Sequence, residues 1–296
     1  DGVGGIAMTE SRDVRRMYRA MHAKRILRTT GLSLVIWIIA VLYVSPILYM
    51  FLSGFKTEYA AINPSLRFTP TLETYRLVLS DPSMWSYLRN SLFQVVAGTA
   101  VSLLLGVPAS FALVFGRFRK KTTNGSIHSW FITTILLPPV AVLIPLYTWY
   151  QSLGLNKTPL GLLIAYVGFH TPIVVWMLYS FFKDVPVEIL EASDIDGCSR
   201  LRQLTAIALP LVRTGIIAAG LLVAVFIWNE FFLGFNLTGI PTATLPVYMA
   251  RFREQQGMFV AQLSASSTIA ILPAIVLGWM TQKALVKGLT LGAVKG

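Results

Sequence analysis

Long apolar runs, each close to the length that crosses a lipid bilayer, dominate this sequence. A hydrocarbon core about 30 Å thick is spanned by a helix of about 20 apolar residues. Runs of this kind occupy roughly residues 31–52, 90–115, 127–150, 160–182, 215–234 and 264–282. Of the 296 residues, 55% are hydrophobic and 13% are charged, whereas soluble domains carry about a quarter charged residues. The sequence therefore predicts an all-α polytopic membrane protein with about six transmembrane helices.

The short segments between the runs leave room for one membrane domain and for no large soluble domain. We predict a basic tail over 1–30, a transmembrane domain over 31–286 that contains a polar segment at 184–210, and a second tail over 287–296. Eighteen of the 25 Lys and Arg residues fall on one side of the alternating topology. Because basic residues concentrate in cytoplasmic segments, both termini are predicted to be cytoplasmic. Orientation in the membrane also explains the net charge of +12, so nucleic-acid binding is not expected.

The sequence lacks the motifs of several kinds of catalytic and metal site. The single cysteine, Cys198, allows neither an internal disulfide nor a multi-cysteine metal site. No Gly-x-x-x-x-Gly-Lys-Ser/Thr loop, which would cradle nucleotide phosphates, is present. His-Glu-x-x-His and Gly-x-Ser-x-Gly are missing as well. These absences disfavour a membrane-embedded enzyme and predict that the chain binds no metal or cofactor of its own.

The polar segment 184–210, termed the knob below, interrupts the apolar runs with two short helices. Asp184 is a plausible N-cap and Pro186 suits the first turn of the first helix. That helix is expected to carry Val185, Ile189 and Ala192 on one face. Gly197 should then end it.

The second helix of the knob is expected to start at Ser199 as N-cap. Its apolar side would comprise Leu201, Leu204, Ala208 and Leu211. Pro210 should redirect the chain into the next apolar run. Two amphipathic helices that offer acids and apolar side chains between membrane spans are suited to docking in a groove on a soluble partner.

Two features inside the apolar runs point to a polar pathway. Pro138 and Pro139, with Pro145, should bend or break the third run, and broken membrane helices often line a cavity; a kinked helix packed against its neighbours is the alternative. Glu230, beside Asn229, lies near the outer end of the fifth run. A carboxylate in hydrocarbon is costly, so Glu230 should face a water-filled path or a gate, unless it already lies in the solvated interface.

The knob resembles the EAA loop of bacterial ABC-importer permeases. The residues that match this pattern are Glu191, Ala192, Asp196, Gly197, Ile207, Leu209 and Pro210. Ser193 replaces the second alanine of the pattern, and both residues are small. Residues 228–231, 244–246 and 288–296 are similar to the carbohydrate-uptake branch of the family, the MalG-like permeases.

This resemblance implies a transport subunit of the bacterial inner membrane with defined partners. It implies a dimer of cytoplasmic ATPase subunits, which bind ATP and Mg²⁺, a second related permease subunit, and an extracytoplasmic solute-binding protein that delivers a carbohydrate. It assigns ATPase contacts to Glu188, Glu191, Ala192, Asp196, Gly197, Leu209 and Pro210 in the knob, and to Gly292, Lys295 and Gly296 in the tail. A polyamine, phosphate or amino acid is the alternative cargo, and Glu230 is the one acidic candidate for contact with a polyamine.

Overall fold

The computed structural model describes residues 30–116, 121–254 and 259–293, and within them every regular element is helical. Five helices are long and apolar enough to cross a membrane, and a bent helix pair makes a sixth candidate. The predicted all-α fold with about six spans is therefore confirmed. The chain divides into two units, of which the first, 1–53, is described only as the apolar helix Thr30–Ser53.

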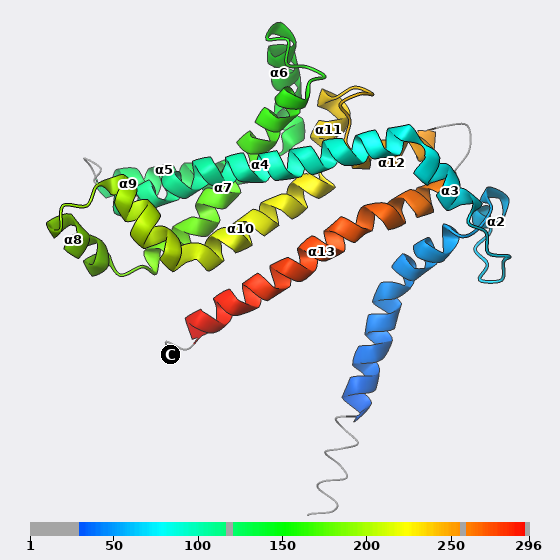
Figure 1. The fold of residues 1–296 in the computed structure, drawn as a ribbon, viewed down its shortest axis with the longest axis horizontal. Coiled ribbons are helices and arrows are strands. Elements are labelled where there is room, and N and C mark those ends of the chain that lie inside the picture. The colour runs from blue at the N-terminus through cyan, green and yellow to red at the C-terminus, as the bar shows by residue number, and fades with distance from the viewer. Residues whose placement is uncertain (1–29, 117–120, 255–258, 294–296) are drawn as a thin grey trace, which may run out of the picture. The chain divides into compact units, whose positions relative to one another are not determined.

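The second unit, 54–296, contains the remaining elements. They are α2 (Glu58–Ile62), α3 (Glu73–Ser80), α4 (Pro82–Phe115), α5 (Lys121–Ile135), α6 (Pro139–Ser152), α7 (Pro159–Lys183), α8 (Val187–Ile195), α9 (Arg200–Arg202), the π-helical turn Gln203–Ala208, α10 (Leu209–Asn229), α11 (Phe232–Leu237), α12 (Leu245–Glu254) and α13 (Val260–Ala293). Helix α4 packs on α7 and α10, and α10 packs in turn on α7 and α13 (Figure 1). The core of this unit lies between these long helices.

Small residues let the long helices approach closely. On α4, Gly98, Ser102, Gly106 and Ser110 recur every fourth residue, so they share one buried face. A Cβ atom at Gly106 would lie 2.5 Å from Cγ1 of Val174 on α7, which is closer than side chains tolerate. In a membrane, where lipid is as apolar as the core, close packing of this kind is a main source of helix association.

Replacing Gly106 by Leu is expected to destabilise the helix pair strongly. The added side chain must displace Val174, and overpacking costs about 1–3 kcal/mol or more. The matched control is Gly168→Leu on α7, because a Cβ atom there meets nothing within 4 Å. In thermal unfolding of the detergent-purified protein, the midpoint temperature should fall strongly for Gly106→Leu and change little for Gly168→Leu. Equal midpoints for the two variants would contradict the close α4–α7 contact.

The third span is broken as predicted. Helices α5 and α6 meet at an angle of 92°. Pro138 is the N-cap of α6 and Pro139 occupies its first turn, where the missing N–H of a proline would have had no helical partner in any case. Pro145, in contrast, lies inside α6 and does not end it. Helix α6 continues past Pro145 to Ser152, so of the three prolines Pro138 and Pro139 mark the break.

The predicted start of the second span, near residue 90, is wrong, because α4 begins at Pro82. Asp81 caps the helix, with Oδ1 accepting from the Ser83 N–H at 2.8 Å and Oδ2 from the Tyr248 hydroxyl at 2.9 Å. Burial alone would raise the pKa of the Asp81 carboxyl, but the hydrogen bonds from Ser83 and Tyr248 and the charge of Arg251 lower it below its ordinary value. The cap therefore extends the span by two turns and ties it to α12.

Glu58 on α2, in the polar loop after the first span, is hydrogen-bonded to the start of the last span, α13. One carboxylate oxygen of Glu58 accepts from the Ala261 N–H at 3.0 Å and the other from the Gln262 N–H at 2.8 Å. These N–H groups belong to the first turn of α13, which has no helical acceptors for them. A carboxylate also complements the positive end of the helix dipole, so Glu58 fixes where α13 begins.

Candidate functional site

The first helix of the knob starts two residues later than predicted. Asp184 is the C-cap of α7, and α8 begins at Val187 with Pro186 in the N-cap position. The expected N-cap at Asp184 is therefore wrong. The helical conformation is disfavoured for a residue that directly precedes a proline. Val185 precedes Pro186, so a helix that began after Asp184 would be interrupted there.

Gly197 ends α8, as predicted. Its φ of +73° lies in the left-handed region that favours glycine. The Gly197 N–H donates to the carbonyl of Asp194 at 3.1 Å, and the Cys198 N–H donates to that of Ser193 at 3.0 Å. This pair of bonds is a Schellman motif, which satisfies carbonyls that the last helical turn leaves free.

The outward face of α8 is both acidic and apolar. Glu188, Glu191 and Ala192 are spaced to share one face, and all are exposed, as are Asp196 and Gly197. The inner side of α8 is formed by Leu190 and Ser193. Ile189 and Ala192, predicted to share a face with the buried Val185, thus belong to the exposed side, because Val185 lies before the helix.

Exposed apolar side chains accompany these acids. Ile195 at the end of α8 is 88% exposed and Leu201 in α9 is 70% exposed. Large apolar side chains rimmed by charge are typical of protein-docking surfaces. The structure thus brings five of the seven knob residues together on an exposed surface.

Leu209 and Pro210 lie apart from that surface, at the start of α10. Ser199 caps α9 as predicted, its Oγ accepting from the Arg202 N–H at 3.4 Å. However, α9, the π-helical turn and α10 form one continuous helix, Arg200–Asn229, so the redirection expected at Pro210 is wrong. The wider π turn directly before Pro210, in which the Leu209 N–H donates to the carbonyl of Leu204, accommodates a ring that would otherwise clash with the carbonyl of the preceding turn.

A buried polar cluster inside the knob was missed by the sequence reasoning. Gln203, the first residue of the π-helical turn, is 0% exposed, and its amide group bonds to Ser193, Asp194 and Arg200. These bonds depend on how α8 folds back onto the helix that follows it. Nothing in the sequence around Gln203, which directly follows Arg202, indicates that its side chain is buried.

At the opposite end of span five, Glu230 interrupts the helix. It is the C-cap of α10, and its carboxylate accepts from the N–H groups of Leu233 at 2.8 Å and Gly234 at 3.1 Å, which begin α11. Asn229 is exposed and donates to the carbonyl of Val225 within its own helix. Glu230 is half-buried and not merely solvated, while its contribution to a path or gate stays a prediction.

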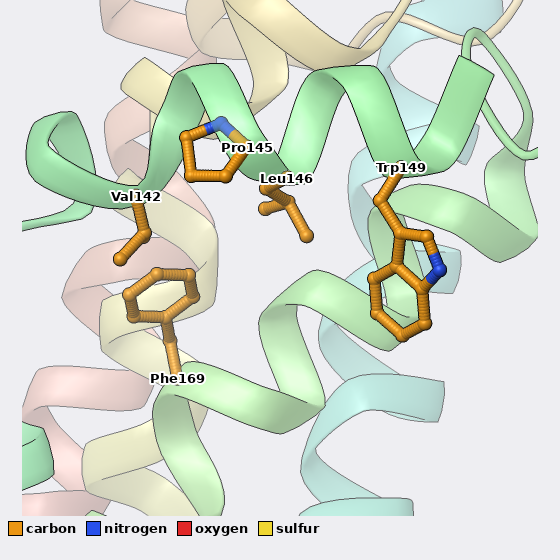
Figure 2. Close-up of a pocket in the computed structure, with 5 residues that line it drawn as sticks. All are labelled: Val142, Pro145, Leu146, Trp149 and Phe169. Atoms are coloured by element: carbon orange, nitrogen blue, oxygen red, sulfur yellow. The ribbon is translucent and has the colours of Figure 1, made fainter. Parts of the chain in front are cut away.

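The broken third span borders an apolar cavity of about 460 Å³. Figure 2 shows Val142, Pro145, Leu146 and Trp149 on α6, with Phe169 on α7 facing them. These described lining residues are all apolar, so they offer aromatic faces but no acceptor for a sugar hydroxyl. The role of Pro138 and Pro139 in lining a path therefore also stays a prediction.

The tail residues are only partly described. Gly292 belongs to the last turn of α13, which runs without interruption from the sixth span to Ala293. Lys295 and Gly296 lie outside the described residues. The expected contact of this tail with an ATPase thus stays a prediction.

Several packed helices long enough to span a membrane, one further span that is broken, and an exposed knob between two spans define a polytopic membrane protein. Residues 103–289 match the family described as binding-protein-dependent transport system inner membrane components, and the chain belongs to this family. The resemblance inferred from the knob is confirmed. The chain is accordingly a multi-span component of the inner membrane.

Relatives along most of the chain support this assignment. The chain is 31% identical to the putative ABC transporter permease protein ORF2 of a Caldicellulosiruptor species, over 85% of this chain and 91% of that protein. It is 30% identical to the trehalose/maltose transport system permease protein MalG of Thermococcus litoralis, over 92% of this chain and 98% of that protein. Its fold is similar to a solved bacterial ABC transporter that imports the acidic polysaccharide alginate, with a TM-score of 0.72 at 23% identity, over 88% of this chain and 97% of that one.

Proposed function

We propose that this chain is the permease subunit of an ABC importer that moves a carbohydrate, delivered by an extracytoplasmic solute-binding protein, into the cell. The observation that carries the proposal is the exposed α8 with its Schellman stop at Gly197, in the position that the EAA pattern gives to the ATPase-docking loop. The names of relatives support the cargo class. They include the trehalose/maltose permease MalG of Thermococcus litoralis and the sulfoquinovosyl glycerol permease SmoH of Agrobacterium fabrum, the latter 30% identical over 85% of this chain.

Energy for transport enters through the knob. The sequence has no phosphate-binding Gly-Lys loop, so ATP and Mg²⁺ are bound by a dimer of partner ATPase subunits at the cytoplasmic face. A second, related permease completes the path, and both termini of this chain are cytoplasmic. Closure of the ATPases on ATP moves α8, and the permease pair rocks between inward-open and outward-open states.

The alternative of a polyamine cargo gains no support from Glu230, because the structure gives this residue another role. A polyamine is recognised by carboxylates, and Glu230 is the one acidic residue inside the predicted apolar runs. Both of its carboxylate oxygens already accept hydrogen bonds from backbone N–H groups of α11. Glu230 thus has a structural role as the cap of α11, which does not require a cationic cargo.

The test is stimulation of ATP hydrolysis in proteoliposomes that contain this chain, its partner permease and the ATPase subunits. Solute-binding protein loaded with maltose, trehalose or another oligosaccharide should raise hydrolysis above its basal rate, while spermidine and amino acids should not. Stimulation by spermidine or an amino acid alone would overturn the carbohydrate assignment. Absence of stimulation by any ligand, with all subunits assembled, would overturn the importer itself.

A further inference from the structure

A buried hydrogen-bond cluster joins α8 to the start of span five. The Nε2 of Gln203 donates to Oγ of Ser193 at 2.8 Å and to Oδ1 of Asp194 at 2.7 Å, and lies 3.3 Å from the carbonyl oxygen of Leu190. Its Oε1 accepts from a guanidinium nitrogen of Arg200 at 2.7 Å. The other terminal nitrogen of Arg200 lies 3.3 Å from Oδ2 of Asp194 and closes the cluster.

The cluster fixes the orientation of the Gln203 amide. An amide nitrogen carries two protons, and both find short acceptors on α8, while the amide oxygen faces a guanidinium, which can only donate. If the Gln203 amide were flipped, its NH₂ group would face the guanidinium of Arg200, and two hydrogen-bond donors would meet. Because Gln203 is fully buried, any bond it lost would not be replaced by water.

Besides the cluster, the buried side chain of Leu190 and the two connections at its ends attach α8 to the rest of the unit. Leu190 and Ser193 are the buried residues of the helix, and Ser193 is itself a member of the cluster. The chain enters α8 through the turn at Asp184–Pro186 and leaves it through Gly197, whose positive φ marks a tight turn rather than a continued helix. In Figure 1, α8 and α9 lie at one end of the bundle, beyond the start of α10. Without the cluster, these two connections could bend.

We propose that Gln203 is a positioning residue for energy coupling. It makes the knob and span five one rigid body, so that a displacement of α8 reaches α10 instead of being absorbed in the loop. The inference rests on the proposed function, because it is the docked ATPase that displaces α8. Buried polar networks whose members are all satisfied are suited to this task, since they rigidify one arrangement.

The test compares Gln203→Met with Thr205→Val in the assembled importer. Methionine keeps the length of the glutamine and removes both the donor and the acceptor. Thr205 is an exposed residue of the same π-helical turn, and its hydroxyl donates only to the carbonyl of Leu201 in its own helix. Spin labels on Ile195→Cys in α8 and Ile217→Cys in α10, with Cys198→Ser, report the distance between the two helices.

Gln203→Met should widen the label-to-label distance distribution at least about twofold, and should lower the sugar moved per ATP hydrolysed about tenfold with the ATPase subunits still bound. Thr205→Val should change neither quantity. An unchanged distance distribution in Gln203→Met would overturn the inference. A widened distribution with unchanged sugar per ATP would overturn its coupling role.

A second variant covers the case in which Gln203→Met does not assemble. Ser193→Ala removes one acceptor of the cluster from a buried site and should widen the same distribution to a smaller extent; no widening would contradict the inference. Both labels lie on this chain, so the distance measurement is valid wherever the ATPase docks. Failure of the proposed function would instead appear as missing contact between α8 and the ATPase, with the Gln203 effect on distance intact.

Discussion

Gly197→Val should lower transport about a hundredfold while the protein still inserts and folds. The reason is that a small displacement of α8, the helix proposed to contact the ATPase, lowers the rate strongly. The site has open space, since a Cβ atom at Gly197 meets nothing within 4 Å. The backbone is the obstacle, because its φ of +73° is strongly disfavoured for a β-branched residue. If the backbone relaxes to relieve this strain, the Schellman hydrogen bonds to the carbonyls of Asp194 and Ser193 break. The direction of α8 then changes. Sugar uptake by membranes with matched protein levels measures the effect.

Gly154 provides a matched control for backbone strain. It lies in the turn between α6 and α7 with a φ of +68°, also with nothing within 4 Å of its Cβ position. Gly154→Val therefore carries the same strain away from the knob, and should lose a similar amount of stability but keep transport. Gly197→Asn should retain most activity, because asparagine tolerates the left-handed region. Transport by Gly197→Val at the level of Gly154→Val would contradict the role of the knob.

Glu230→Ala should destabilise the outer end of span five by about 3 kcal/mol, because each donor left without a partner costs about 1–3 kcal/mol. The two donors are the N–H groups of Leu233 and Gly234, both on buried residues. Glu230→Gln keeps one acceptor oxygen and should lose about half as much. Asn229→Ala is the control, since that exposed side chain bonds only within α10. Thermal unfolding of the purified protein measures the order of these losses.

The same variants test the gate. If α11 closes the outer end of the path, loosening its cap with Glu230→Gln should change basal ATP hydrolysis in the absence of solute-binding protein and leave sugar preference unaltered. Asn229→Ala should leave both quantities unchanged. A changed preference among sugars with unaltered basal hydrolysis would instead place Glu230 in the substrate site.

Local rules predicted the features that local chemistry decides. The apolar runs located the spans, Pro138 and Pro139 located the break in the third span, and Gly197 and Ser199 located the end of one knob helix and the start of the next. Each of these positions depends on a residue's own backbone preference or on a cap within a few residues. Distant contacts did not need to be known.

Pro210 and Glu230 show where local rules fail. A proline usually ends a helix, but the π-helical turn before Pro210 removes the clash, and no sequence rule predicts that turn. The sequence predicts that Glu230 faces a water-filled path or a gate, or lies in the solvated interface, but it does not predict the hydrogen bonds that Glu230 makes to the short helix α11. Gln203 is the clearest case, since all its partners but one lie on α8. The hydrogen-bond clusters that position the candidate site are thus set by tertiary structure.

The central claim, that α8 receives the ATPase, is tested most directly by site-specific cross-linking in native membranes. A cysteine replaces Ile195 on α8, which is 88% exposed, or Ile240 in the loop between α11 and α12, which is 83% exposed, in a chain with Cys198→Ser. The account predicts that Ile195→Cys cross-links to the ATPase subunits, in a pattern that changes with bound nucleotide, and that Ile240→Cys does not. Absence of an Ile195→Cys product in every nucleotide state while uptake proceeds, or an equal product from Ile240→Cys, would contradict it.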